Sequence, residues 1–110
     1  MPDEALEIFS NVLQRWPERK NLWLVMGQTE LSKPQSSNPA QALAYLEKAI
    51  DSGYKTAQAY ALLGLAYSQM GEKENALKNL EQALRLDPSR NDARELLDRV
   101  KRDSLSYQNR

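Results

Sequence analysis

The amino-acid sequence predicts an all-α fold of about six antiparallel helices that stack as repeats. A nine-residue phrase that begins at Ala42 returns 34 residues later at Ala76, with Ala, Leu, Leu, Glu and Ala in register. Apolar residues fall at helical spacing throughout, and no stretch alternates with a period of two. A fixed period of roughly 20 to 50 residues is typical of supersecondary units that bury their apolar faces by stacking.

Residues that start and stop helices divide the chain into six segments. Proline disfavours the α conformation in the residue before it, and Asn38-Pro39 offers a capping side chain followed by a residue suited to the first helical position. Gly53 and Gly71 accept the left-handed conformation that commonly ends a helix. The expected helices run from Asp3 (as N-cap) to before Pro17, 18–31, 39 to Gly53, Thr56 to Gly71, 72–86, and Ser89 or Asn91 to 105.

One insertion separates the two copies of the repeat. The apolar pattern that ends at Gly27 returns after 37 residues at Gly64, whereas the phrase at Ala42 returns after 34. Three extra residues must therefore lie between Gly27 and Ala42. Residues 32–39, with their prolines and small polar side chains, are the expected place. We interpret this loop as a tolerated insertion rather than a contact site.

Two glycines are expected inside helices, where glycine costs about 1 kcal/mol relative to alanine. Apolar turns flank both Gly27 and Gly64, so we expect each to let a neighbouring backbone approach closely. The aromatic residues at helical spacing are expected in the core rather than on exposed binding platforms: Phe9, Trp23, Tyr60 and Tyr67.

Composition argues against several classes of function. The 15 basic and 15 acidic residues balance, whereas a nucleic-acid or membrane-surface role needs clustered cations. Histidine and cysteine are absent, and no Gly-rich phosphate loop or nucleophile motif is present. No apolar run approaches the ~18 residues of a membrane span. We therefore expect no enzyme, metal, cofactor or small-molecule substrate, and the compartment stays open between cytoplasm and periplasm.

Residues 57–90 resemble a complete tetratricopeptide (TPR) repeat. The positions that carry the resemblance are Tyr60-x2-Leu63-Gly64-x2-Tyr67, then Ala76-x3-Leu80-x2-Ala83, followed by Pro88. Residues 20–56 resemble a second, degraded repeat. There Glu30 stands where the family places Tyr, and Tyr54 stands in place of the closing Pro.

The two ends of the chain extend the resemblance. Residues 3–17 resemble the second helix of an earlier repeat whose first helix is missing. Residues 91–107 resemble the solvating helix that closes such arrays, because polar side chains replace the core residues at Arg94, Asp98 and Lys101. We therefore interpret residues 1–110 as one TPR domain, the C-terminal fragment of a bacterial-type array.

The resemblance implies a right-handed α-α superhelix whose first helices line a concave groove. TPR domains generally hold a helix or an extended segment of a partner protein, so it implies a non-catalytic scaffold within a multi-protein assembly. The Lys and Asn of the family's two-carboxylate clamp are largely absent here. The corresponding groove residues are Asn21, Leu24, Val25, Gln28, Gln58, Ala61, Leu62, Leu65, Gln69, Asp92, Glu95, Leu96 and Arg99.

Three surface features have two interpretations each. The apolar groove residues either seat a partner or pack against adjacent helices. Glu30 either lies exposed beside the enlarged turn, which we expect, or pairs with Lys33. The basic residues near the end of the last helix (Arg99, Lys101, Arg102) either suit a helix C-terminus, which we expect, or bind an anionic partner.

The first helix predicts an alternative function. Without an antiparallel mate it should leave apolar side chains partly uncovered, and an exposed apolar patch favours association. Either the chain was excised from a longer array, or a second copy covers the face and gives a homodimer. The residues expected to self-associate are Leu6, Ile8 and Leu13.

Overall fold

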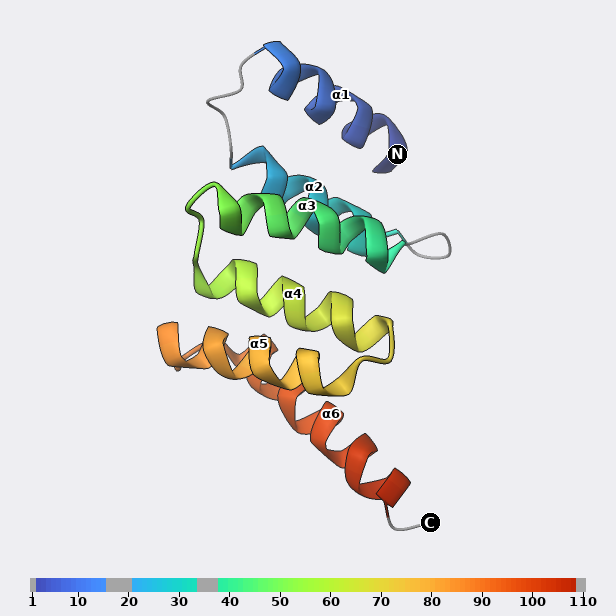
Figure 1. Ribbon diagram of the computed structural model, residues 1–110, viewed down its shortest axis with the longest axis vertical. Coiled ribbons are helices and arrows are strands. Elements are labelled where there is room, and N and C mark those ends of the chain that lie inside the picture. Colours follow the sequence, from blue (N-terminus) through green and yellow to red (C-terminus); the bar gives the residue numbers. More distant parts are fainter. Residues whose placement is uncertain (1, 16–20, 34–37, 109–110) are drawn as a thin grey trace. The chain divides into compact units, whose positions relative to one another are not determined.

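The structure is a computed structural model that describes the backbone of residues 2–15, 21–33 and 38–108, and the side chains of 7–15, 21–33 and 38–103. In this part of the chain all regular elements are helices, which confirms the all-α class (Figure 1). The helices are α1 (Pro2–Arg15), α2 (Leu22–Leu31), α3 (Pro39–Asp51), α4 (Ala57–Gln69), α5 (Lys73–Leu86) and α6 (Asn91–Gln108).

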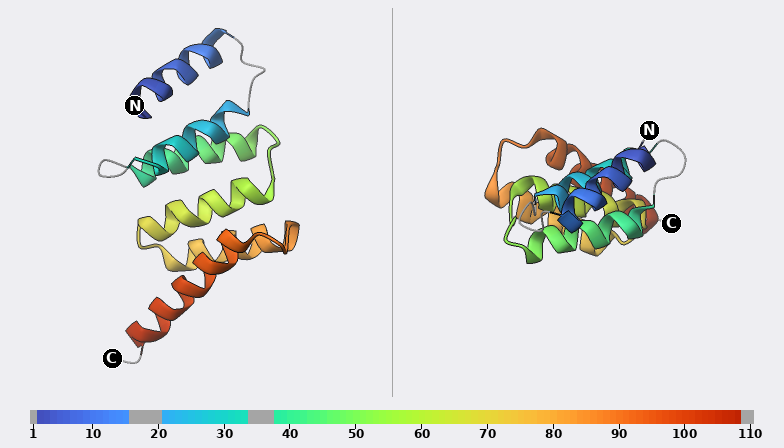
Figure 2. Two further views of the ribbon diagram at one scale, coloured as in Figure 1. Left: turned by 180° about the vertical axis from the view of Figure 1, so that it is seen from behind. Right: turned by 90° about the horizontal axis from the view of Figure 1, so that it is seen from above.

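The chain forms two compact units, Met1–Lys55 and Thr56–Arg110. In the first unit α2 packs against both α3 and α1. In the second unit α5 packs against both α4 and α6, and α4 also contacts α6 (Figures 1 and 2). Each unit therefore contains one helical hairpin, α2–α3 or α4–α5, and one additional helix.

A glycine of the first helix lies against a leucine of the second in both hairpins. A Cβ added at Gly27 would lie 2.6 Å from Leu46 Cγ, and one added at Gly64 would lie 2.5 Å from Leu80 Cγ. In both cases the next helix's backbone is farther away, with an alanine carbonyl oxygen at 3.4 Å. The predicted close approach is confirmed, but a leucine side chain rather than the backbone fills the space.

Most helix boundaries follow the predicted capping residues. The Asn38 side chain accepts a hydrogen bond from the Gln41 amide (3.1 Å), and Thr56 accepts one from the Ala59 amide (3.2 Å). Gly53 and Gly71 have positive φ angles of 102° and 79°. These two glycines end α3 and α4, because their conformation reverses the chain without a Cβ clash.

Some boundaries differ from the expectation. The first helix begins at Pro2, so Asp3 lies within its first turn instead of capping it. The second begins at Leu22 rather than near residue 18, and the last extends to Gln108. Pro17 and the rest of 16–20 lie outside the described residues, as do residues 34–37 of the enlarged turn.

Glu30 is buried, so the expectation that it lies exposed is wrong. Its relative exposure is 2%, and its carboxylate lies 2.8 Å from the Lys33 ammonium nitrogen. Its other oxygen accepts a hydrogen bond from the backbone amide of Asn38 at 3.0 Å. The carboxylate thus joins the end of α2 to the start of α3.

Candidate functional site

Both first helices carry more apolar side chains than their hairpins bury. In α2, Met26 and Gly27 are buried, whereas Leu24 and Val25 stay half-buried. In α4 the same division recurs, with Leu63 and Gly64 buried. The half-buried apolar residues of α4 are Leu62 and Leu65. A helix with apolar residues around most of its circumference has surface available for a second contact.

Polar predicted groove residues accompany this apolar surface. Asn21, Gln28 and Gln69 are exposed, and Gln58 is half-buried. Helical spacing places Gln28 on the same side of α2 as Leu24 and Val25, since residues three and four apart are neighbours. Amide side chains in such places are suited to hydrogen-bonding the backbone of a bound segment.

The second unit corrects one predicted groove residue. Ala61 is only 8% exposed and belongs to the unit's core, which is completed by residues of α5 and α6. Leu96 is half-buried and packs against the same core, whereas Glu95 and Arg99 are exposed. Ala61 faces inward because α6 contacts α4 as well as α5. The other core residues are Ala76, Leu80, Ala83, Ala93, Leu97 and Val100.

The polar residues that set α6 apart from a repeat helix lie at the surface. Arg94, Asp98 and Lys101 are all exposed. The face of α6 that packs against the core of its unit carries Ala93, Leu97 and Val100. The basic residues Arg99 and Arg102 are exposed as well. The described part of α6 is therefore amphipathic, with one apolar face turned to the core of its unit.

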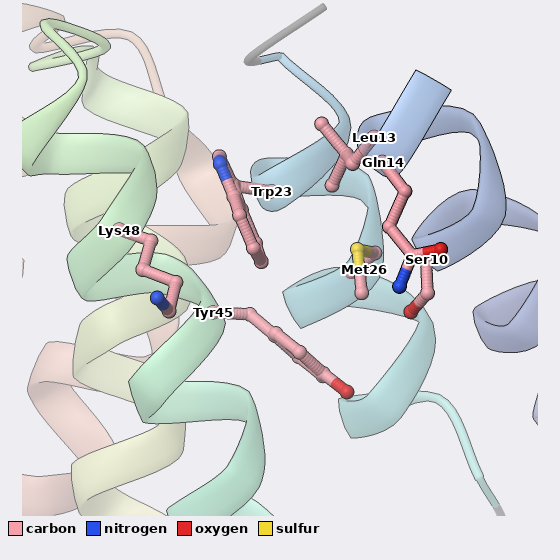
Figure 3. Close-up of a pocket in the computed structure, with 7 residues that line it drawn as sticks. All are labelled: Ser10, Leu13, Gln14, Trp23, Met26, Tyr45 and Lys48. Atoms are coloured by element: carbon pink, nitrogen blue, oxygen red, sulfur yellow. The ribbon is translucent and has the colours of Figure 1, made fainter. Parts of the chain in front are cut away.

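A pocket of about 400 Å³ lies between α1, α2 and α3 in the first unit (Figure 3). The Trp23 and Tyr45 rings stack with centroids 6.2 Å apart, and the Lys48 ammonium lies 4.9 Å from the Trp23 ring centroid. Leu13 and Met26 supply the buried apolar wall. Ser10 and Gln14 of α1 complete the lining.

Trp23 is thus a packing residue, as are the other aromatic residues of the TPR pattern. Phe9 and Trp23 pack against the buried pair Leu13–Met26, and Tyr60 and Tyr67 pack against the core of the second unit. Tyr45 and Lys48 were missed by sequence reasoning. Their positions lie inside the repeated phrase, but the second copy has unrelated residues there, so the repeat gave no signal.

The outer face of α1 remains partly apolar. Ile8 is 59% exposed, and it lines a shallow pocket of about 250 Å³ with Asn11, Val12 and Arg15. Leu13, expected to be uncovered, is instead 8% exposed, because it packs against Met26 of α2. The side chain of Leu6 lies outside the described residues.

Charged side chains organise the turn between α5 and α6. The pKa of the Asp87 carboxyl is lowered, mainly because it accepts hydrogen bonds from the Ser89 hydroxyl (2.6 Å) and amide (3.1 Å). The pKa of Asp92 is also lowered, chiefly by its hydrogen bonds from the Arg90 guanidinium, the shortest of which is 2.9 Å. These carboxylates stabilise a turn and do not converge on a cavity.

Two kinds of site are not found in the part of the chain that the structure describes. The Asp and Glu side chains there do not gather in groups of three or more that could hold a metal ion. Nor does any helix there combine the length and the apolar character needed to cross a membrane.

Two tetratricopeptide repeat models match this chain, one over residues 57–90 and the other over 34–72. Together they span more than half of its length. With the repeated glycine–leucine hairpins, these matches show that the chain belongs to the TPR family. Members of this family are generally non-catalytic modules that bind other proteins or peptides, and this chain is therefore an interaction scaffold by class.

A bacterial protein shares part of this sequence. The chain is 40% identical over 80 residues to the cellulose synthase operon protein C of Escherichia coli strain K12, and equally similar to a protein of Escherichia coli O157:H7. The match covers 71% of this chain but 7% of the relative. The chain thus spans a small fraction of the length of the relatives that it matches.

Solved structures have the same fold. The first TPR domain of the human RPAP3 protein superposes with a TM-score of 0.86 at 21% identity, covering 98% of this chain and 83% of that one. The MamA protein superposes with a TM-score of 0.80 at 29% identity, covering 94% of this chain and 55% of that one. These similarities confirm a fold of the TPR superhelical class.

Proposed function

We propose that this chain holds a helix or an extended segment of a partner protein against its first helices, α2 and α4. The observation that carries the proposal is the half-buried apolar surface that both helices retain beside their buried glycine faces. Leu24 and Val25 supply it on α2, and Leu62 and Leu65 supply it on α4. The family's general role in binding proteins and peptides supports this use of the surface.

The neighbouring polar residues define the kind of partner. Apolar side chains of a bound segment would cover the leucines, while Gln28 and Gln69, both exposed, would hydrogen-bond its backbone. Neither helix concentrates basic residues on this face, so the surface favours a partner with apolar anchors over a strongly acidic one. A role inside a larger assembly is a further part of the proposal.

Selection from a library of random peptides displayed on phage tests this function. Enriched peptides should carry apolar residues at helical or alternating spacing, and Leu62→Asp should weaken their binding at least tenfold. Leu86→Asp is the matched control, because Leu86 is a 49% exposed leucine on the second helix of the same hairpin. Circular dichroism must show that both variants fold. Equal binding by the two variants would remove α4 from the proposed site.

Self-association is the second candidate, and one observation favours it. Ile8, with 59% of its surface exposed, is the described member of the predicted patch that a second copy would cover. The burial of Leu13 reduces the patch. Sedimentation equilibrium over a range of concentrations should reveal a dimer that Ile8→Asp dissociates. A monomer at every concentration would exclude this candidate.

A further inference from the structure

The pocket between α1, α2 and α3 combines buried apolar side chains, two aromatic rings and one charge. Leu13 and Met26 in its lining are 8% and 1% exposed. The stacked rings of Trp23 and Tyr45, with 28° between their planes, form another part of it. Lys48 is exposed and lies beside these rings (Figure 3). With a volume of about 400 Å³, the pocket has the size of sites that hold small ligands.

The packing of the hairpin does not require the aromatic ring and the charge on α3. The second copy of the repeat has Asn79 where the first has Tyr45, and Gln82 where the first has Lys48. Both hairpins nevertheless bury the leucine between these positions completely. A hairpin of this kind therefore forms with polar, uncharged residues at both positions, so Tyr45 and Lys48 are available for a role other than packing.

The charge of the lining favours an anionic ligand. Of the seven side chains that line the pocket, Lys48 is charged and the other six are neutral. Its acidic neighbours in α3, Glu47 and Asp51, are exposed and do not line the pocket. The Lys48 ammonium nitrogen lies 4.9 Å from the centre of the Trp23 ring, so an anion that it binds would lie beside an aromatic surface. A molecule that joins a flat ring to a carboxylate can make both contacts.

We propose that this pocket binds a small aromatic carboxylate. Its ring would lie against Trp23 and Tyr45, and its carboxylate would pair with Lys48. Ser10 and Gln14 of α1 offer a hydroxyl and an amide to polar substituents of the ring. The ligand would be held without being converted, as expected of a non-catalytic protein. None of these residues belongs to the proposed protein-binding surface, so the inference does not depend on that function.

Two probes that share one ring system and differ in charge test the ion pair: the naphthoate anion and its neutral amide, naphthamide. In an NMR titration of the isotope-labelled full chain, naphthoate should shift amide signals of the pocket residues and bind more tightly than naphthamide. Lys48→Gln introduces the residue of the second copy. It should weaken naphthoate binding about fivefold, the upper range for an exposed ion pair, and leave naphthamide binding unchanged. Lys78→Gln, at an exposed lysine of α5, is the matched control and should change neither.

A further variant tests the aromatic part of the lining. Tyr45→Asn also introduces the residue of the second copy. It should weaken the binding of both probes by the same factor, roughly threefold, because it removes a ring contact and no charge. Circular dichroism must show that every variant keeps the helix content of the unsubstituted chain.

Five results would overturn the inference. The first is that naphthoate is not bound at any concentration at which it stays soluble. Equal affinities of the two probes, or equal effects of Lys48→Gln and Lys78→Gln, would exclude the ion pair. Shifts confined to Leu24, Val25 and Gln28 would place the ligand on the protein-binding surface. Finally, a tetrapeptide with a phenylalanine beside an aspartate, bound more tightly than naphthoate at the same residues, would assign the pocket to a partner protein.

Discussion

The hairpins α2–α3 and α4–α5 share their packing and differ in how their turns and ends are built. Both place a glycine against a leucine, with nearly equal Cβ distances of 2.6 and 2.5 Å. Yet residues 32–38 connect the first pair, while residues 70–72 connect the second. The two hairpins therefore share the glycine–leucine contact between their helices, although the segments that connect the helices differ in length and sequence.

The second helices of the two hairpins, α3 and α5, also end with different hydrogen bonds. In α3 the Gly53 amide donates to the Ile50 carbonyl (2.9 Å) and the Tyr54 amide to the Ala49 carbonyl (3.0 Å), which together form a Schellman motif. In α5 the corresponding end is Asp87-Pro88, where the Asp87 amide donates to Ala83 (2.9 Å). Tyr54 replaces the proline of the TPR pattern because this position must donate a hydrogen bond.

The largest effect should come from the turn that only the first hairpin has. Glu30→Ala would leave the half-buried Lys33 without this carboxylate and the Asn38 amide without its acceptor. We expect a loss of roughly 3 to 5 kcal/mol in the free energy of unfolding, as for other broken buried ion pairs. Chemical denaturation measures it. Glu47→Ala, at an exposed site on α3, should change stability little; a comparable loss there would contradict the role given to Glu30.

Overpacking should affect both hairpins alike. Gly27→Leu and Gly64→Leu would each force a side chain into space held by Leu46 or Leu80, so we expect each to cost about 1 to 3 kcal/mol. Thermal and chemical unfolding provide the measurement. If one variant were as stable as the unsubstituted chain, the two hairpins would not share the same contact.

A smaller change in stability should distinguish the C-terminal end of α3 from that of α5. Tyr54→Pro removes the donor that the Ala49 carbonyl accepts, and we expect a cost of about 1 kcal/mol, the usual value of one such hydrogen bond. The reverse change, Pro88→Tyr, breaks no such bond and should cost less. Urea midpoints of the two variants compare them directly, and equal values would refute the explanation given for Tyr54.

The smallest expected effect is the loss of stability at low pH that Asp87 and Asp92 cause. Because the folded-state pKa values of Asp87 and Asp92 are lowered, their contribution to stability is present above their ordinary pKa of about 4 and is lost as the pH falls through the folded values. Ser89→Ala should raise the pKa of Asp87 towards its ordinary value in a carboxyl NMR titration. An unchanged titration would show that Ser89 does not hold this carboxylate.

Much of this fold followed from residues whose effect is local. Asn38, Thr56, Gly53 and Gly71 predicted helix ends because caps and left-handed glycines act within a few residues. Gly27 and Gly64 predicted a close contact because a repeat made their neighbours recognisable. Together these residues predicted the helices and the pairing of the hairpins.

The errors came from contacts that spacing does not reveal. Glu30 was expected to be exposed, since nothing in the sequence showed that the start of α3 would return to it across the enlarged turn. Ala61 was expected to line the groove, because the sequence did not reveal that α6 contacts α4. That contact joins residues far apart in the chain. Leu13 was expected to be uncovered because the first helix lacks an antiparallel mate before it, but Met26 of α2, the next helix in the chain, packs against it.

Site-specific photocrosslinking tests the central claim, that the first helices carry the binding surface. A benzophenone amino acid at Gln28 or Gln69, both exposed, should crosslink a peptide enriched from the phage library. The same group at the exposed Glu81 of α5 should not. Crosslinks from position 81, with none from 28 or 69, would contradict the account and move the binding surface to the second helices.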